Sequence, residues 1–201
     1  MSFHPQMAYD ASFHKSARTL TEPGERFTYT SGNRARFDAI VARYPPDRRR
    51  SALLPALYLV QYQQGHVTAN AMRYVAELLG MTPADVEDVV SYYTMFYTKP
   101  VGTFVINVCR TLSCALNGAE RVTEQICDRL GIKPGETDPS GPFTLVEVEC
   151  LGACDRAPVV MVNDSWHECL SPDEASKLLD DLRTRGGAAL SGCHHAIERK
   201  R

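Results

Sequence analysis

The sequence predicts a small helical bundle followed by an α/β domain with the element order β-α-β-β-α. Segments with apolar residues at helical spacing precede Pro100, whereas short β-branched segments follow it. A helical segment separates the first two strands, and such a crossover predicts that these strands are parallel. We therefore expect four parts: an extended N-terminal arm (1–32), a helical bundle (33–98), the α/β domain (99–185) and a flexible tail (186–201).

The composition indicates a folded protein that neither binds nucleic acid nor spans a membrane. Hydrophobic residues make up 44% of the 201 residues, and 22 basic residues nearly balance 24 acidic ones. No apolar run approaches the roughly 18 residues of a transmembrane helix, and the N-terminus lacks the apolar region of a secretory signal. We therefore expect a cytoplasmic protein whose seven cysteines are metal ligands or free thiols.

Proline residues help to delimit the first two predicted helices. The first helix stops at Pro45-Pro46 and carries four apolar residues at helical spacing: Phe37, Ile40, Val41 and Tyr44. The second helix covers about residues 52–64, with Pro55 in or near its first turn and Gly65 at its end.

Threonine residues begin the next two helices. Thr68 can cap a helix that runs to Leu79, and Thr82 followed by Pro83 and Asp85 is typical of the start of another. The expected buried face of this fourth helix contains Val86, Val89, Val90, Tyr93 and Phe96. Four helices with short links predict a bundle. Tyr92 is expected nearer the outside of this bundle, where either the following α/β domain or a partner protein covers it.

The α/β domain contains alternating strand and helix signals. Three β-branched segments predict strands: 103–108, 143–149 and 158–163. A helix over 118–130 lies between the first two strands and ends at Gly131. Ser171 and Glu174 have the spacing of a capping box at the start of the last helix.

Four cysteines follow two of the predicted strands. Cys109 directly follows the first strand and Cys114 comes five residues later, whereas Cys150 follows the second strand and Cys154 comes four residues later. Neighbouring strands lie about 4.8 Å apart, so the carboxyl ends of a parallel pair bring both cysteine loops to one edge of the sheet. We therefore expect the four thiols to bind one metal centre.

The spacing within each cysteine pair favours an iron–sulfur cluster over a zinc ion. A single zinc ion, about 2.3 Å from each sulfur, suits two-residue knuckles, but the C-x4-C and C-x3-C loops of this chain are wider. Plant-type [2Fe–2S] ferredoxins also contain a C-x4-C spacing. Zinc binding, and simple packing of the four thiols as core residues, remain the alternatives.

Two glycines and two arginines accompany the cysteines. Gly118 and Gly152 can turn backbone N–H groups toward cluster sulfurs, and such hydrogen bonds change the reduction potential of a cluster. Arg110 and Arg156 can offset the negative charge of a cluster. All four residues are therefore candidate neighbours of the metal centre.

The other three cysteines are not expected to be ligands. Cys127 lies on the predicted helix and should pack in the core, and Cys169 should be a small core residue. Cys193 precedes His194 and His195 in the predicted tail. These three residues could bind a metal ion, although a chance cluster is favoured.

Several segments of the chain resemble a known family. They are CRTLSC, LGIKPGET and FTLVEVECLGACDRAP, with LGMTPADVEDVVSYYTMF upstream. They resemble the thioredoxin-like [2Fe–2S] subunit, the one of the E type, of NADH:quinone oxidoreductase (respiratory complex I) over about residues 35–183. The resemblance implies a helical bundle before a thioredoxin-like ferredoxin domain, with one [2Fe–2S] cluster bound by Cys109, Cys114, Cys150 and Cys154.

The resemblance also implies a function in electron transfer. As a subunit of NADH:quinone oxidoreductase, the chain would have no catalytic residue and no substrate-binding active site of its own. NADH and flavin mononucleotide (FMN) would bind to a flavin-bearing partner subunit, with which the helical bundle and the arm form a heterodimer. In agreement, the chain contains no G-x-G-x-x-G dinucleotide motif.

The implied location is a complex peripheral to the inner, cytoplasmic face of the cell membrane. Other peripheral-arm subunits of complex I would be further partners. Because the motifs are shared, the same module could instead serve a soluble NAD-linked hydrogenase or formate dehydrogenase. A zinc-stabilised structural or interaction subunit is the alternative from a different functional class.

Overall fold

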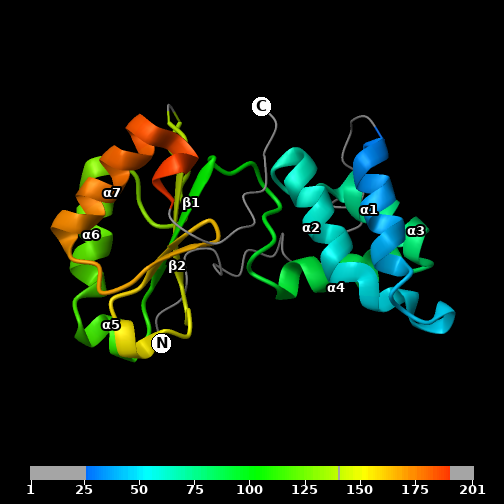
Figure 1. Ribbon diagram of the computed structural model, residues 1–201, viewed down its shortest axis with the longest axis horizontal. Helices are drawn as coiled ribbons and strands as arrows, with labels where there is room; N and C mark the ends of the chain where they lie inside the picture. The colour runs from blue at the N-terminus through cyan, green and yellow to red at the C-terminus, as the bar shows by residue number, and fades with distance from the viewer. Residues whose placement is uncertain (1–25, 140, 191–201) are drawn as a thin grey trace. The chain divides into compact units, whose positions relative to one another are not determined.

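The computed structural model describes residues 26–139 and 141–190, and the chain divides into two units between Pro100 and Val101. The described part of the first unit is helical, and the second contains a four-stranded sheet with helices (Figure 1). This order confirms the predicted fold class, a helical bundle followed by an α/β domain. In the described part of the chain, no helix combines the length and apolar character needed to cross a membrane.

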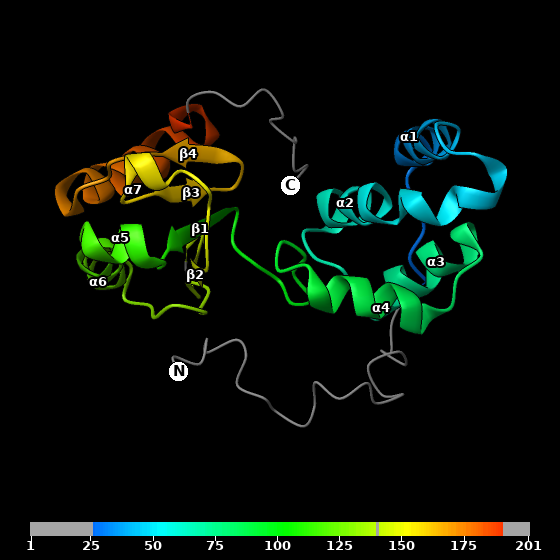
Figure 2. The ribbon, with the colours of Figure 1, turned by 90° about the horizontal axis from the view of Figure 1, so that it is seen from below.

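The last two helices of the helical unit begin as the sequence predicts. Its elements are α1 (Ser31–Val41), η4 (Pro46–Ala52), α2 (Leu53–Gln64), α3 (Ala69–Leu79) and α4 (Pro83–Tyr92). The four α-helices are labelled in Figures 1 and 2. The Thr68 hydroxyl accepts a hydrogen bond from the Ala71 N–H (3.2 Å), and Thr82 and Asp85 form the predicted capping box. Gly80 ends α3 in the left-handed conformation, as expected of a helix-terminating glycine.

The segment after α4 completes the core of the helical unit. α4 ends at Tyr92, so Phe96 is buried, as predicted, but from beyond the helix rather than on its face. The buried Gln61 side chain holds this segment, because it donates to the Met95 carbonyl oxygen and accepts from the Tyr97 N–H, both at 2.8 Å. Tyr92 is 80% exposed, in agreement with the prediction.

The described end of the predicted arm belongs to the helical core. Residues 26–30 form neither helix nor strand, but Phe27 and Tyr29 are buried. The Tyr29 hydroxyl donates to the carbonyl oxygen of Ala56 (2.8 Å), and its ring packs edge-on against that of Tyr74. Two isolated aromatic residues have no helical periodicity, and for this reason the sequence pattern did not place them in the core. The rest of the arm lies outside the described residues.

The α/β unit contains a mixed sheet with the strand order β2-β1-β3-β4. Its strands are β1 (Phe104–Cys109), β2 (Phe143–Val148), β3 (Val160–Val162) and β4 (Ser165–His167). β1 and β2 are parallel, which confirms the prediction from the crossover helix, and β3 is antiparallel to both β1 and β4. β4 was not predicted, because three residues are too few to show an alternating pattern.

Gly102 allows β1 and β2 to begin close together. A Cβ atom at this position would lie 2.3 Å from the carbonyl oxygen of Pro142, so no larger residue fits without a shift of the backbone. The Gly102 N–H donates to the Thr144 hydroxyl (2.7 Å). Beyond these contacts the two strands pair from Phe104 opposite Phe143 onward. This register also places the carboxyl ends of the two strands side by side.

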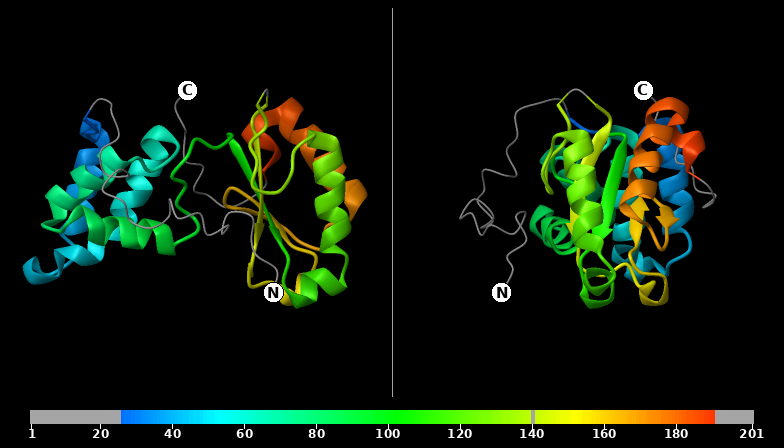
Figure 3. Two further views of the ribbon diagram at one scale, coloured as in Figure 1. Left: turned by 180° about the vertical axis from the view of Figure 1, so that it is seen from behind. Right: turned by 90° about the vertical axis from the view of Figure 1, so that its left-hand side faces the viewer.

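Helices α6 and α7 cover the same face of the sheet (Figures 1 and 3). The helical elements of this unit are α5 (Leu112–Leu116), α6 (Ala119–Leu130), η5 (Cys154–Arg156), α7 (Pro172–Arg185) and η6 (Gly186–Ala189). The core between helices and sheet contains Ile106, Val108, Val122, Ile126, Phe143, Leu145, Val160, Leu179 and Leu182. The predicted bounds of α6 are confirmed, and so is the start of α7 with its Ser171–Glu174 capping box. α5 was not predicted, because five residues are too short for a periodic signal.

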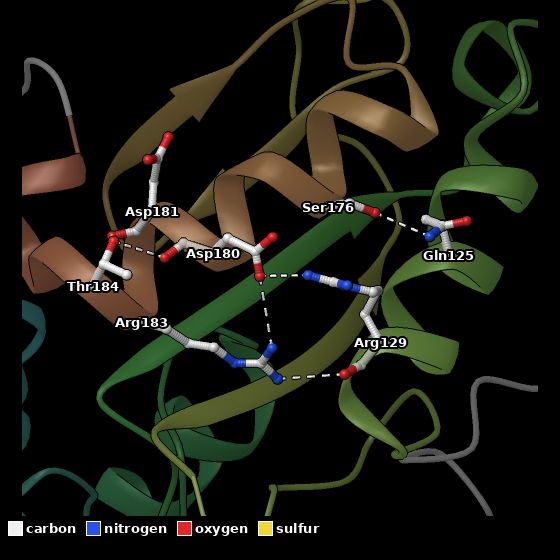
Figure 4. A network of polar contacts seen from close by, with 7 residues as sticks. All are labelled: Gln125, Arg129, Ser176, Asp180, Asp181, Arg183 and Thr184. Atoms are coloured by element: carbon white, nitrogen blue, oxygen red, sulfur yellow. Dashed lines mark hydrogen bonds and ion pairs between the residues drawn. The ribbon is translucent and has the colours of Figure 1, made fainter.

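Polar contacts join α6 to α7 on the outer side of this layer (Figure 4). Gln125 donates to the Ser176 hydroxyl at 2.9 Å, and Arg129 pairs with Asp180. Arg183 donates to the Arg129 carbonyl oxygen (3.3 Å), which links the carboxyl ends of the two helices. The pairing fixes the helical layer against which the sheet packs.

Residues 186–190, the first residues of the predicted tail, include a helical turn and pack against the α/β unit. Gly186–Ala189 forms η6, and Ala189 and Leu190 contact the core of the α/β unit. Flexibility was the prediction for 186–201, and it is wrong for these first residues because two of their apolar side chains are partly buried. Residues 191–201 lie outside the described part of the chain.

Candidate metal centre

The two cysteine loops meet at one end of the sheet. Because β1 and β2 are parallel, with Cys109 opposite Val148, their carboxyl ends lie side by side. The Cys109 thiol lies 3.3 Å from the carbonyl oxygen of Glu149, so the end of β1 contacts the loop that follows β2. Figure 1 shows α5 and the short yellow helix η5 together at this end of the unit. The structure therefore brings the two predicted ligand loops together.

The first loop places Cys109 and Cys114 in the core. Cys109 ends β1 and Cys114 lies on α5, and the two residues are only 2% and 1% exposed. Each of the two thiols affects the pKa of the other. The other side of α5 faces outward, since Leu112 and Leu116 are 74% and 78% exposed. α5 therefore separates a buried sulfur from an apolar surface.

The second loop holds Cys150 and Cys154 at the surface. Cys150 lies two residues beyond β2, Cys154 is the first residue of η5, and both residues are exposed. Gly152 has a φ of +85°, a left-handed conformation that glycine adopts at little cost. The charge of Cys154 affects the pKa of Cys114, so the exposed loop is an electrostatic neighbour of the buried pair.

Burial is the main influence on the Cys114 thiol. Burial, the hydrogen bond with Cys109 and the charges of Cys109 and Cys154 raise the pKa of Cys114 to about 11. The backbone N–H of Val159 acts in the opposite direction, because it stabilises the thiolate. The neighbouring sulfurs thus disfavour ionisation of Cys114, and a positively charged metal centre would stabilise its thiolate.

Hydrogen-bond donors surround the Cys109 sulfur. Burial raises the pKa of this thiol, but hydrogen bonds with Thr111 and with the backbone N–H of Leu151 outweigh burial, and the pKa is lowered. The Thr111 hydroxyl oxygen lies 3.2 Å from the Cys109 Sγ. Donors of this kind stabilise the thiolate, which is the form of cysteine that binds metals.

The donor set fits a [2Fe–2S] cluster. Such a cluster takes four thiolates, two on each iron, and this site offers two cysteine pairs from two adjoining loops. Hydrogen bonds to the sulfurs are typical of iron–sulfur ligands. Between residues 26 and 190, position 140 excepted, no group of three or more His, Cys, Asp or Glu lies close enough to hold a single metal ion. Two cysteine pairs on adjoining loops are the donor arrangement that a two-iron cluster would use.

The predicted accompanying residues make other contacts. The Gly118 N–H donates to a carbonyl oxygen of α5 (3.1 Å), so it is used at the helix end and not at a sulfur. Arg110 pairs with Glu149 at 2.6 Å, and Arg156 pairs with Glu168 at 3.4 Å. Both arginine charges are thus already compensated in part by neighbouring carboxylates.

Two of the remaining cysteines, Cys127 and Cys169, belong to the described residues. Cys127 is half-buried on α6 and packs against the core, in agreement with the prediction. Cys169 was predicted to be a core residue, but it is exposed. Its backbone adopts a φ of 52° and its N–H donates to the Arg156 carbonyl oxygen (2.7 Å), which turns the side chain outward. The third cysteine and its neighbours lie outside the described residues: Cys193, His194 and His195.

Three residues of the site carry no recognisable sequence signal. Thr111 stands directly before a short helix, so its position alone would indicate a helix cap. Leu151 and Val159 contact the sulfurs through backbone N–H groups, which a side-chain pattern cannot reveal. Only the three-dimensional arrangement identifies these donors.

A sheet with two cysteine pairs at the ends of neighbouring parallel strands defines a metal-cluster protein of the α/β class. Residues 37–183 match the family model described as thioredoxin-like [2Fe-2S] ferredoxin. The chain belongs to the thioredoxin-like [2Fe–2S] ferredoxin family. This membership confirms the predicted thioredoxin-like fold and the predicted type of cofactor.

Curated relatives make the family assignment more specific. The chain is 41% identical over 150 residues to an NADH-quinone oxidoreductase subunit of the E type from Rhizobium meliloti (strain 1021), and the match covers 75% of this chain and 88% of the relative. It is 42% identical over 143 residues to NADH-quinone oxidoreductase subunit 2 of Thermus thermophilus, where the match covers 71% of this chain and 79% of the relative. These relatives confirm the predicted resemblance to complex I subunits of the E type.

A solved structure shares the fold at low identity. NAD+-reducing [NiFe]-hydrogenase in the air-oxidized state contains a chain that is similar with a TM-score of 0.59 and 19% identity. The match covers 67% of this chain and 23% of the hydrogenase chain, so the shared part is about a quarter of that protein's length. At this identity the likeness shows the fold alone.

Proposed function

We propose that this chain is the electron-transfer subunit of an NADH:quinone oxidoreductase and that Cys109, Cys114, Cys150 and Cys154 bind its [2Fe–2S] cluster. The observation that carries the proposal is the meeting of both cysteine loops at one sheet edge, in a chain 41% identical to an NADH-quinone oxidoreductase subunit. A bound cluster supplies one-electron chemistry, accepting and releasing a single electron at a time.

The two cysteine loops would have different roles in binding the cluster. Cys109 and Cys114 anchor the site in the core, where burial excludes water and hydrogen bonds set the electrostatic environment of the sulfurs. Cys150 and Cys154 complete the ligand set from the surface, and an electron donor can approach from this exposed side. No proton transfer by the chain is needed for this role.

We further propose that the partner is the flavin-bearing, NADH-binding subunit, which holds FMN and NADH. The names of the relatives, as numbered or lettered subunits, support a multi-subunit assembly. Exposed apolar side chains offer contact surface in both units, namely Tyr92, Leu112 and Leu116. In this assembly the chain is peripheral to the cytoplasmic face of the cell membrane, together with the other peripheral-arm subunits.

A soluble NAD-linked hydrogenase or formate dehydrogenase is the second candidate host. The fold that this chain shares with the NAD+-reducing [NiFe]-hydrogenase is the observation that supports this second candidate. Isolation of the chain from its host with its neighbouring subunits discriminates between the two. Co-purification with quinone-reducing subunits supports the main proposal, whereas co-purification with a hydrogenase or formate dehydrogenase subunit supports the second.

The cluster is tested by metal analysis of the purified chain. We expect reddish-brown protein with two iron and two acid-labile sulfide per chain, and a rhombic electron paramagnetic resonance (EPR) signal after reduction with dithionite. NADH should reduce the cluster only when the flavin-bearing subunit is also present. Stoichiometric zinc without iron would instead support the zinc-stabilised structural subunit.

The partnership is tested by co-purification with the flavin-bearing subunit. We expect the full chain to form a stable heterodimer and a variant lacking residues 1–25 to bind more weakly. The truncation should stop at residue 25, because Phe27 and Tyr29 belong to the bundle core and their removal would disturb folding. Tyr92→Ser tests the bundle surface separately. If all forms remain monomeric beside the flavoprotein at micromolar concentration, the proposed partnership is wrong.

A further inference from the structure

Thr111 occupies a helix-capping position without acting as a side-chain cap. Its backbone φ and ψ of −76° and 170° and its carbonyl oxygen, which accepts from the Ala115 N–H at 2.9 Å, are those of an N-cap residue of α5. A threonine in this place normally accepts a hydrogen bond from the helix with its side chain, but the Thr111 side chain makes no such bond. Helix capping therefore does not account for the orientation of the hydroxyl.

The Thr111 hydroxyl points instead toward the sulfur of Cys109. The two atoms lie 3.2 Å apart, and in the metal-free chain either of them could donate. A cysteine that binds iron has lost its proton and can only accept, so in the loaded protein the hydroxyl must be the donor. The thiol contact with the carbonyl oxygen of Glu149 (3.3 Å) has no proton left to share in that state. Of these two contacts, only the one with Thr111 can therefore supply a hydrogen bond to the iron-bound sulfur of Cys109.

We propose that Thr111 is a positioning residue whose hydroxyl donates a hydrogen bond to the ligated Cys109 sulfur and raises the reduction potential of the cluster. The inference rests on the ligand assignment in the proposed function. Addition of one electron, supplied by a reduced flavin or by dithionite in the experiment, makes the sulfur ligands more negative. A hydrogen bond to a more negative acceptor is stronger, so the hydroxyl stabilises the reduced form more than the oxidised form. Thr111 keeps its proton throughout.

The test is a potentiometric titration of the purified chain, followed by the EPR signal of the reduced cluster. Thr111→Val removes the hydroxyl and keeps the branched shape, whereas Thr111→Ser keeps the hydroxyl. The matched control is Thr123→Val, because the Thr123 hydroxyl donates within α6 to the Ala119 carbonyl oxygen (3.1 Å). At the midpoint potential of the unaltered chain, we expect the reduced-to-oxidised ratio of Thr111→Val to fall by about threefold to tenfold, where tenfold corresponds to about 59 mV for one electron. Thr111→Ser and Thr123→Val should titrate like the unaltered chain.

Either of two titration results would overturn the inference while leaving the proposed function intact. One is an unchanged midpoint potential in Thr111→Val with full iron content, and the other is an equal shift in Thr111→Val and Thr111→Ser. If Thr111→Val fails to hold the cluster, Thr111→Ala removes the hydroxyl with less bulk and should show the same lowering. Loss of iron from both variants would make Thr111 a requirement for assembly, which also contradicts a tuning role. Absence of a cluster from the unaltered chain would refute the proposed function itself.

Discussion

The two cysteine loops contribute equal numbers of thiols but belong to different environments. Cys109 and Cys114 are buried, at the end of a central strand and on a helix, whereas Cys150 and Cys154 are exposed around a glycine turn. Both loops follow strands of the same parallel pair, but β1 is an inner strand of the sheet and β2 lies at its edge. Cys109 is the last residue of β1 and Cys114 is the buried residue of α5, whereas Cys150 and Cys154 lie beyond the end of β2, where the described loop has only the short η5. The first pair is therefore part of the fold, and the second pair is an addition to its surface.

Serine substitutions should separate these two roles, with the largest expected effect at Cys114. Cys114→Ser and Cys154→Ser should both lower or alter the cluster signal. In metal-free protein, Cys114→Ser should also reduce the free energy of unfolding by about 1–3 kcal/mol, because it buries a hydroxyl in an apolar place. Cys154→Ser should change it by no more than about 0.5 kcal/mol, as expected of an exposed residue. Urea unfolding and iron analysis measure the two effects.

A non-ligand cysteine provides the control for this comparison. Cys127→Ala should keep the full iron content, because Cys127 packs on α6 away from both loops. Cys169→Ser should do the same from its exposed position. Loss of iron from the Cys127 variant would show that the ligand assignment is wrong. Equal destabilisation by Cys114→Ser and Cys154→Ser would show that the second loop is also part of the folded core.

In the metal-free chain, the buried and exposed cysteines should also differ in their rates of alkylation. This effect is expected to be smaller than the effects of the serine substitutions. The pKa of Cys114 is raised to about 11, so at pH 8 only about one thiol in a thousand is ionised, and burial further hinders the reagent. Cys150 and Cys154 should react with iodoacetamide first, and Cys169 should match them as an exposed control. The Cys114 rate should rise as the pH increases toward 11, since deprotonation supplies the reactive thiolate. Peptide mapping by mass spectrometry measures each rate, and equal rates at Cys114 and Cys154 would contradict the comparison.

Sequence patterns predicted the elements that repeat a signal over two or more turns or a full strand. α3 is an example, since Thr68 and Gly80 bracket an apolar stripe between them. The parallel pairing of β1 and β2 followed from the crossover helix, and with it the meeting of the two cysteine loops at one edge. Shorter elements carried too few residues for a periodic pattern, as α5 and β4 show.

Tertiary contacts determined what the sequence could not predict. Phe27 and Tyr29 enter the bundle core from an extended segment, where their burial depends on the distant Tyr74 and Ala56. The exposure of Cys169 depends on a local left-handed backbone conformation that its residue type does not favour. At the candidate site, residue identities and spacing predicted which loops come together, but not which thiols are buried or which donors surround them.

The central position of β1 has a consequence for the speed of electron exchange. The Cys109 N–H donates to the Val159 carbonyl oxygen and the next N–H, that of Arg110, donates to the Val148 carbonyl oxygen, both at 3.1 Å. Neighbouring segments on both sides therefore hold the backbone at this sulfur. A ligand held in this way shifts little when the charge beside it changes, so little free energy is spent on rearranging the surroundings. In the proposed site, the rigid strand would thus favour rapid electron exchange in both directions.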